Sequence, residues 1–185
     1  MTDGRAVHAT DPRAGGPKGG RQAPQGSQKF VTFFLADEEY GIEILKVHEI
    51  IGMMSITRVP RTPTHVRGVI NLRGKIIPVL DLRLKFLMPP TDDTDQTCII
   101  VVQAAGGQMG VVVDRVSEVL AIDSDDIEET PSFGCEVNTD YILGVGRAGD
   151  RVKLLLDIDK VLSAGDVADM QSAAREPAAV QLQAA

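Results

Sequence analysis

The chain contains an internal repeat, and this feature constrains its fold more than any other. The segment YGIEILKVHEII (40–51) aligns without a gap on MGVVVDRVSEVL (109–120), at an offset of 69 residues. A second match, at an offset of 76 residues, places Gly68-Val69 on Gly144-Val145 and Asp81-Leu82 on Asp157-Ile158. Because glycine and charged positions agree as well as apolar ones, duplication explains the match better than chance similarity between apolar strands. In the first alignment the matching pairs are Gly41 and Gly110, Ile42 and Val111, Ile44 and Val113, Lys46 and Arg115, Val47 and Val116, Glu49 and Glu118, and Ile50 and Val119.

Strand signals follow the same order in both halves. Val/Ile-rich runs separated by short turns predict four hairpins, at KFVTFFLADEEYGIEI, GVINLRGKIIPVLDL, CIIVVQAAGGQMGVVVD and YILGVGRAGDRVKLLLDI. Helices are expected only at DLRLKFL and DIDKVLS, with about two turns each. Asp81, Asp114 and Asp157 are expected to cap short helical turns through their side-chain oxygens. Two repeats are too few for a solenoid, so the pattern predicts an all-β fold of two small barrels packed together.

The domain organisation follows from changes in composition along the chain. Residues 1–28 are rich in Gly, Pro, Gln, Ala and Arg, and we expect a disordered tail there because they cannot bury enough apolar area to offset ordering entropy. The folded part is expected at 29–162, with a first barrel at approximately 29–90 and a second at approximately 95–162. Exchange of strands between the two is possible. Residues 163–185 are expected to be a marginal helix or disordered.

Composition excludes several classes of function. With 43% hydrophobic residues in 185, the chain can bury a core. Its net charge of -7 argues against nucleic-acid binding, which requires cationic groups, and the absence of Trp argues against base-stacking platforms. The N-terminus lacks the apolar segment of a signal peptide, and no run approaches the length of a membrane-spanning helix. We therefore expect a cytoplasmic protein that meets a membrane only through a partner.

No motif in the sequence indicates catalysis. The chain lacks G-x-S-x-G, H-E-x-x-H and phosphate-loop patterns, and its possible ligands stand apart at His48, His65, Cys98 and Cys135. The acidic stretch DSDDIEE lacks the central glycine of an EF-hand loop. The glycine-rich stretch AAGGQMG joins two strands rather than preceding a helix, so a hairpin turn is expected instead of a phosphate cradle. We expect no enzyme activity, no metal and no cofactor.

What remains is a possible binding surface. Glu49 lies among apolar residues in KVHEIIG, and Arg73 lies at a hairpin tip beside Leu72. They could be only an outward strand residue and a solvated turn. Alternatively, a groove between two barrels, with apolar walls and a few charges, would suit a helical partner. Asn71 and Arg73 are absent from the matching hairpin of the second half, which makes them candidates for contact rather than scaffold.

The sequence resembles the chemotaxis coupling protein family, which is CheW-like. The resemblance rests on DEEYGIEILKVHEI (37–50), ITRVPRTPTHVRGVINLRGKIIPVLDLRLKF (56–86), GVVVDRVSEVL (110–120) and YILGVG (141–146), and it covers nearly all of 29–162. It implies two SH3-like five-stranded β-barrels. It also implies a non-catalytic adaptor, without cofactor, that joins methyl-accepting chemoreceptors to the regulatory domain of the CheA histidine kinase in arrays under the inner membrane.

The resemblance also implies which residues touch each partner. Receptor contacts are expected at Val47, Glu49, Gly68, Asn71 and Arg73. Val47 offers apolar area, Glu49 and Arg73 offer opposite charges, and Gly68 permits close backbone approach in the groove.

Kinase contacts are expected from the resemblance at Cys98, Val116 and Phe133. Cys98 stands where relatives more usually carry Val, and it should pack as a small apolar group. Ser132 stands where relatives often carry an acid, so one charged contact is in doubt.

Two alternative functions stay open. The same fold could serve a chemosensory pathway that is not flagellar, and identifying the kinase in a pull-down would distinguish it. The cleft between barrels could instead bind a small ligand, in which case metal or nucleotide should accompany the purified protein.

Overall fold

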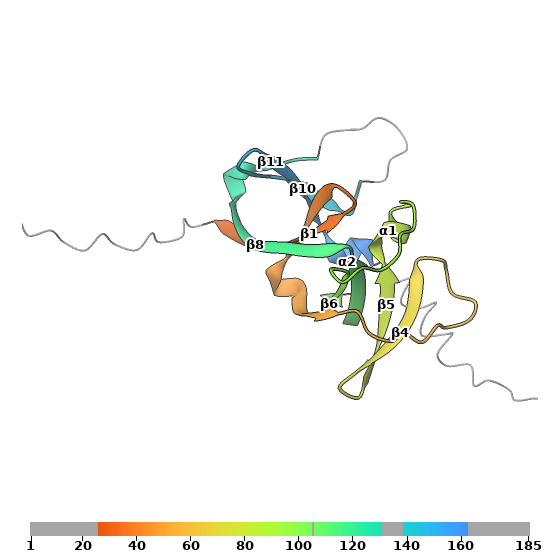
Figure 1. Cartoon of the computed structure of the whole chain (residues 1–185). Helices are drawn as coiled ribbons and strands as arrows, with labels where there is room; N and C mark the ends of the chain where they lie inside the picture. Colours follow the sequence, from red (N-terminus) through yellow and green to blue (C-terminus); the bar gives the residue numbers. More distant parts are fainter. Residues whose placement is uncertain (1–25, 105, 131–138, 163–185) are drawn as a thin grey trace, which may run out of the picture.

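The computed structural model describes residues 26–104, 106–130 and 139–162, which form two β-sheets (Figure 1). The fold is mostly β, as the sequence predicted. Sheet A has the strand order β8-β1-β2-β11-β10-β9, with β1 Ser27–Leu35, β2 Glu38–Glu43, β8 Arg115–Asp123, β9 Ile127–Glu128, β10 Ile142–Ala148 and β11 Arg151–Leu156. Sheet B has the order β3-β6-β7-β5-β4, with β3 Val47–Gly52, β4 Val66–Leu72, β5 Lys75–Asp81, β6 Cys98–Ala104 and β7 Gly107–Val113.

Each sheet takes one hairpin from the other half of the chain. The β1–β2 hairpin of the first half lies in sheet A between β8 and β11, and the β6–β7 hairpin of the second half lies in sheet B between β3 and β5. The contacts β2–β11 and β5–β7 are parallel, whereas the other strand pairs are antiparallel. The ranges 29–90 and 95–162 therefore do not coincide with the two sheets. The reason is local, because the three-residue 3-10 turn η1 Ile44–Lys46 carries the chain directly from sheet A into sheet B.

The segment that follows β3 or β8 joins the two edges of each sheet. In sheet B, Thr57 and Val69 exchange two backbone hydrogen bonds of 2.9 Å, which connect the chain after β3 to β4. In sheet A, β9 follows β8 and pairs with β10 through Val145 and Glu128. Both sheets thus curve round into small barrels, which we call barrel A and barrel B.

Buried side chains form three clusters that match this architecture. One lies within barrel B, one within barrel A, and the largest lies where the two barrels meet. The barrel B cluster comprises Ile70, Ile77, Val79, Ile99, Val101 and Val112. The barrel A cluster comprises Phe30, Ile122 and Leu155. The shared cluster comprises Phe33, Leu35, Ile42, Val66, Leu80, Leu82, Ile100, Val102, Ala104, Met109, Val111, Val113, Leu156, Ile158, Val161 and Leu162.

The helices are shorter than the sequence indicated. α1 Leu82–Lys85 and α2 Ile158–Val161 have four residues each, rather than about two turns. As predicted, the Asp81 carboxylate accepts a hydrogen bond from a backbone N–H in the first turn of α1, and Asp157 does the same for α2.

The prediction for Asp114 was wrong. The chain continues after Asp114 into β8 instead of a helix, and its carboxylate accepts a hydrogen bond from the Ala36 backbone N–H at 2.7 Å. The acidic stretch that follows β8 forms the 3-10 turn η2 Ser124–Asp126.

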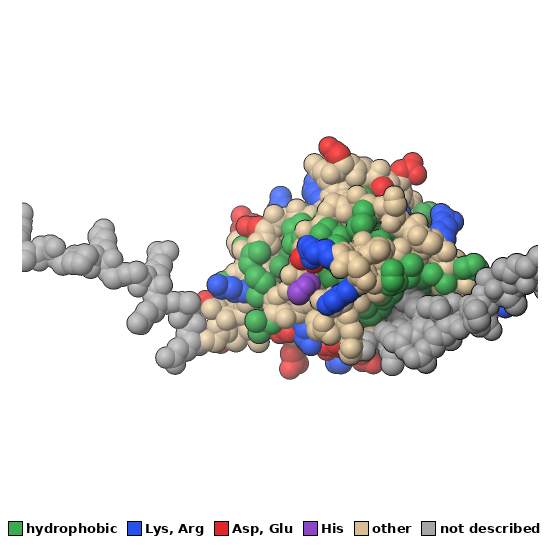
Figure 2. Space-filling view, turned by 90° about the horizontal axis from the view of Figure 1, so that it is seen from below, with side chains coloured by type: hydrophobic (Ala, Val, Ile, Leu, Met, Phe, Trp, Pro, Cys, Tyr) green, Lys and Arg blue, Asp and Glu red, His purple; other side chains and the backbone are tan. Residues whose placement is uncertain are grey.

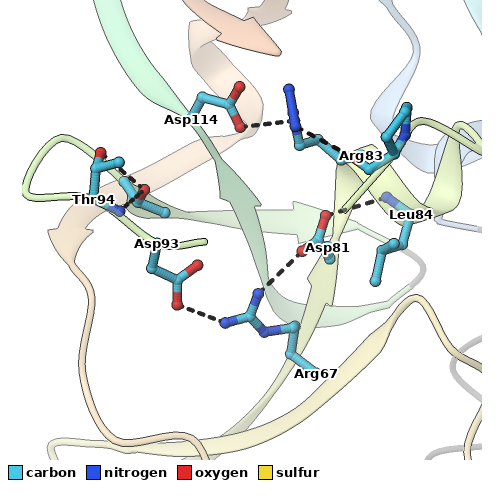
Figure 3. Close-up of polar contacts among 9 residues, drawn as sticks. Arg67, Asp81, Arg83, Leu84, Asp93, Thr94 and Asp114 are labelled. Atoms are coloured by element: carbon cyan, nitrogen blue, oxygen red, sulfur yellow. Dashed lines mark hydrogen bonds and ion pairs between the residues drawn. The ribbon is translucent and has the colours of Figure 1, made fainter. Parts of the chain in front are cut away.

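A polar network fastens the link between the two halves (Figure 3). Arg67 on β4 bridges Asp81, at 3.2 Å, and Asp93 of the linking segment, at 2.7 Å. Arg83 of α1 forms an ion pair with Asp114 at 3.1 Å, just before β8. The Arg67–Asp93 contact holds the segment between α1 and β6 against barrel B. Charges as well as apolar packing therefore help to position β6.

Several sequence-based predictions fall outside the described residues. They concern residues 1–25 and 163–185 of the two tails, and Phe133, Ser132 and Cys135. Strand β1 begins at Ser27, two residues inside the predicted N-terminal tail, because Ser27 pairs with Asp123 at the end of β8.

Candidate functional site

The turn between β4 and β5 presents the arginine singled out in the sequence. Arg73 and Gly74 form a two-residue turn with φ of 50° and 85°, which is the left-handed geometry that matches the twist of a hairpin. Asn71 stabilises it, because its Oδ1 accepts a hydrogen bond from the Gly74 backbone N–H at 2.8 Å. The turn therefore holds the base of the Arg73 side chain at the end of barrel B.

Arg73 forms a bidentate ion pair with Glu49 of β3. Its Nη1 and Nη2 donate to the two carboxylate oxygens at 2.7 and 2.6 Å. The Arg73 side chain is 71% exposed and that of Glu49 is 19% exposed, so the cation covers the anion. Hydrogen bonds from Arg73 lower the pKa of Glu49, and the same contact raises the pKa of Arg73. The two residues, expected to offer opposite charges to a partner, therefore form one ion pair with no net charge.

Exposed apolar side chains lie on the strands next to this ion pair in the sequence. Ile50 follows Glu49 on β3, and Ile76 lies opposite Asn71 in the β4–β5 hairpin; both are exposed. Val47 is half-buried and packs onto the shared cluster. Figure 2 looks onto the end of the molecule where this hairpin projects, and hydrophobic and basic side chains gather near the middle of that face. Apolar area next to a fixed charge pair suits docking better than chemistry.

Gly68 is required by the fold of barrel B, and not by the close approach of a partner that the sequence analysis expected. It is buried, its φ is 138°, and an added Cβ would lie 2.1 Å from the Thr57 carbonyl oxygen. The close backbone approach is therefore to the chain's own segment that closes barrel B. The second half repeats the device, since a Cβ on Gly144 would lie 2.7 Å from the Glu128 carbonyl oxygen. Gly68 lies on the strand that leads to Asn71, and thus supports the surface from within.

The two described members of the second predicted set lie together. Cys98 begins β6 and Val116 lies on β8, and the Val116 backbone hydrogen-bonds to the Cys98 thiol. Burial raises the pKa of Cys98 above its usual range, although this hydrogen bond opposes the shift. Both side chains are half-buried against the shared cluster. The third member, Phe133, lies outside the described residues.

The described residues assemble no recognisable catalytic or metal centre. Within 26–104, 106–130 and 139–162, no group of three or more His, Cys, Asp or Glu side chains is placed to hold a metal ion. A hollow of about 530 Å³ opens between the 58–67 loop and residues 91–93, and its lining holds no His or Cys. No helix in these ranges is long and apolar enough to cross a membrane.

Sequence reasoning missed one buried charged pair. Lys153 on β11 donates a hydrogen bond to Glu39 on β2 at 2.5 Å, with the two side chains 3% and 5% exposed. A signal was present, because Lys153 interrupts an apolar strand at the position two residues before the buried Leu155 and so points inward.

Comparison with known proteins agrees with this architecture. A family model described as the CheW-like domain matches residues 29–166. The chain is 41% identical over 148 residues to a chemotaxis protein CheW of Klebsiella aerogenes, covering 80% of this chain and 89% of the relative. It is 36% identical over 134 residues to a chemotaxis protein CheW of Helicobacter pylori, covering 72% of this chain and 81% of the relative.

A solved structure is similar in fold and sequence. The crystal structure of the scaffolding protein TtCheW from Thermoanaerobacter tengcongensis matches with a TM-score of 0.70 and 36% identity, covering 76% of this chain and 95% of that chain.

Proposed function

This chain belongs to the CheW-like family, whose members are non-catalytic chemotaxis adaptors, and from that membership we propose that it joins methyl-accepting chemoreceptors to the CheA histidine kinase. The observation that carries the proposal for this chain is the Glu49–Arg73 ion pair on barrel B, which also exposes Ile50 and Ile76. Signals from the receptors would then reach the kinase through contacts on two faces of one rigid body.

The receptor contact is assigned to the face that holds Val47, Glu49, Asn71 and Arg73, with Gly68 supporting it from below. The cytoplasmic tip of a chemoreceptor is helical, and a helix can lay an apolar stripe on Ile50 and Ile76. The charged groups of the ion pair would meet polar residues at the margin of that stripe. Because the pair holds both charges in one geometry, they offer the receptor helix a fixed set of polar contacts.

The kinase contact is assigned to the surface around Cys98 and Val116, together with Phe133. The half-buried Cys98 and Val116 side chains join β6 to β8, so the contact would lie where the two barrels meet. Two separate faces allow one adaptor to hold two partners at once. Weak contacts on each face can sum to a stable array through multivalency, and we place the protein in such arrays, at the cytoplasmic side of the inner membrane.

The receptor contact is tested with Arg73→Asn. Asn tolerates the left-handed backbone at this turn, whereas Ala would be strained there, so the substitution removes the guanidinium with little cost to the hairpin. We expect binding to a receptor signalling fragment to weaken by about tenfold in isothermal titration calorimetry. The matched control is Arg147→Asn, because Arg147 is an exposed arginine paired with Glu128 on barrel A. Equal losses for both variants, or no loss for either, would reject the assigned face.

The kinase contact is tested separately with a fragment of the CheA regulatory domain. Val116→Ala should weaken binding to this fragment and leave receptor binding unchanged, while Arg73→Asn should do the reverse. If each variant affects both partners equally, the two contacts do not lie on separate faces. Pull-down of the kinase from the source cells would also decide between a flagellar and another chemosensory pathway.

A further inference from the structure

The strand that receives the exchanged hairpin pairs with it in the same way in both barrels. In barrel A, β2 lies parallel to β11 with Gly41 opposite Leu155. In barrel B, β7 lies parallel to β5 with Gly110 opposite Val79. The two hairpins are related by the offset of 69 residues and the two receiving strands by the offset of 76. Strand pairing by itself therefore does not determine which hairpin enters which barrel.

The side chains inside the barrels do differ at one matched set of positions. Barrel A holds Lys153 on the receiving strand, with Glu39 and Thr32 on the hairpin, and all three are buried. The matching positions of barrel B are Ile77, Gln108 and Val101, respectively, and carry no charge. An ionic centre in one barrel thus corresponds to an uncharged centre in the other.

The ionic centre is fully satisfied only in the observed arrangement. Lys153 donates to Glu39, and Glu118 Oε1 lies 3.9 Å from the same Lys153 Nζ. Ser117 also hydrogen-bonds to the Glu39 carboxylate, and Thr32 Oγ1 donates to the Glu118 carbonyl at 3.0 Å. Burial by itself would raise the pKa of Glu39, yet Lys153 and the hydrogen bonds to Glu39 lower it, so the carboxylate is charged. Charged groups as buried as these require a partner.

We propose that the buried Glu39–Lys153 pair directs the first-half hairpin to barrel A. It thereby makes a first half pair with a second half, and disfavours pairing between the same halves of two different chains. A contact between two first halves would bury Glu39 against Ile77. A contact between two second halves would bury Lys153 against Gln108. The first contact leaves the buried Glu39 without a counter-charge, and the second leaves Lys153 only the exposed Glu118 at 3.9 Å, so both are unfavourable. The segment 88–97 between the halves has no helix or strand, so it would not by itself prevent halves of different chains from meeting.

The test uses two full-length variants, Glu39→Lys and Lys153→Glu, refolded separately and together. Each variant by itself brings two like charges together inside barrel A. A mixture can escape by exchanging halves, because the first half of the Glu39→Lys chain then meets the second half of the Lys153→Glu chain, and the other two halves form the native pair. We expect co-refolding to give a heterodimer of two 19.8 kDa chains, in at least about tenfold excess over dimers of either variant. Light scattering with differently tagged chains measures it.

A chain carrying both substitutions controls for tolerance of the reversed charges. It restores opposite charges within one molecule, so it should refold as a monomer with a higher denaturation midpoint than either single variant. The proposal is wrong if the mixture shows no excess of heterodimer. It is equally wrong if the doubly substituted chain is no more stable than the single variants, or if the single variants refold as monomers with the wild-type midpoint.

Discussion

At the scale of single residues, Gly68 shows how a residue assigned to a partner can be required by the fold itself. Its positive φ excludes most side chains, and the Thr57 carbonyl oxygen occupies the space that a Cβ would take. The sequence identified the position, because the glycine recurs as Gly144 in the second half. It did not identify the neighbour, because Thr57 reaches Gly68 only when barrel B closes.

Gly68→Ala should therefore be much more damaging than Gly74→Ala. Both residues have positive φ, but a Cβ on Gly74 would meet nothing within 4 Å. We expect Gly68→Ala to lower the free energy of unfolding by about 3 kcal/mol or more, and Gly74→Ala by about 1 kcal/mol. Urea denaturation measures both. Similar losses for the two variants would show that backbone conformation, and not the contact with Thr57, explains the glycine.

The Glu39–Lys153 pair should make stability depend on pH in the acid range. The pKa of Glu39 in the folded chain lies below the ordinary value of 4.5, so the unfolded chain binds its proton first as pH falls. The contribution of Glu39 is thus fully present at neutral pH. It declines as pH falls below about 4.5 and is lost once pH passes the folded pKa. Protonation would leave the buried Lys153 cation without its counter-charge.

The double variant Glu39→Gln/Lys153→Ile provides the comparison for this effect, because it places the matching barrel B residues at both positions. We expect the wild type to lose stability relative to the double variant when urea denaturation is repeated from pH 7 down to pH 3. The size of the difference at pH 7 does not matter for this test. Parallel stability curves for the two proteins over that range would contradict the assignment.

At the scale of elements, the hairpins were predictable and the closing segments were not. Each hairpin is built from neighbouring runs with a turn between them, so local sequence contains its whole signal. By contrast, β9 has two residues and the Thr57 contact is a single bridge. Neither carries a periodic pattern, because each is held by the edge strand that it meets. The one-turn helices were predicted in part, because the sequence indicated their capping aspartates but not their length.

The two helix-capping aspartates should differ in their importance. Asp157 caps α2 and pairs at 3.6 Å with the exposed Lys160, whereas Asp81 caps α1 and pairs at 3.2 Å with the more buried Arg67. We expect Asp157→Ala to cost about 1 kcal/mol of unfolding free energy and Asp81→Ala about 3 kcal/mol. Asp81→Asn separates the two roles, because it keeps an oxygen for the cap but loses the charge. An Asp81→Asn variant as stable as the wild type would show that the ion pair with Arg67 contributes little.

At the scale of the whole molecule, hairpin exchange makes the barrels interdependent. Neither barrel can form without a hairpin from the other half, and the largest cluster of buried side chains lies between them. We therefore expect the described part of the chain to unfold in one cooperative transition. The two proposed partner contacts would then sit on a single rigid body, which suits a protein that transmits position rather than performs a reaction.

This cooperativity is testable with matched cavities. Val79 in barrel B and Leu155 in barrel A occupy equivalent positions and are both fully buried. Val79→Ala and Leu155→Ala should each cost about 2 to 4 kcal/mol, and each should lower amide hydrogen-exchange protection in both sheets. Loss of protection confined to the mutated barrel would show that the barrels unfold separately.

The amino-acid sequence by itself determined the duplication, the all-β class, the four hairpins, the family and the residues at the Arg73 turn. All of these depend on neighbours in the chain or on a repeated pattern. Only the tertiary structure decided that the halves exchange hairpins, that Glu49 and Arg73 pair with each other, and that Lys153 meets Glu39 across 114 residues. The hairpin exchange and the contact between Lys153 and Glu39 depend on which of two equivalent strands lies beside a hairpin, whereas the pair of Glu49 and Arg73 depends on the closure of barrel B. The repeat makes that choice ambiguous in sequence, and buried charge and the short link after β2 resolve it in space.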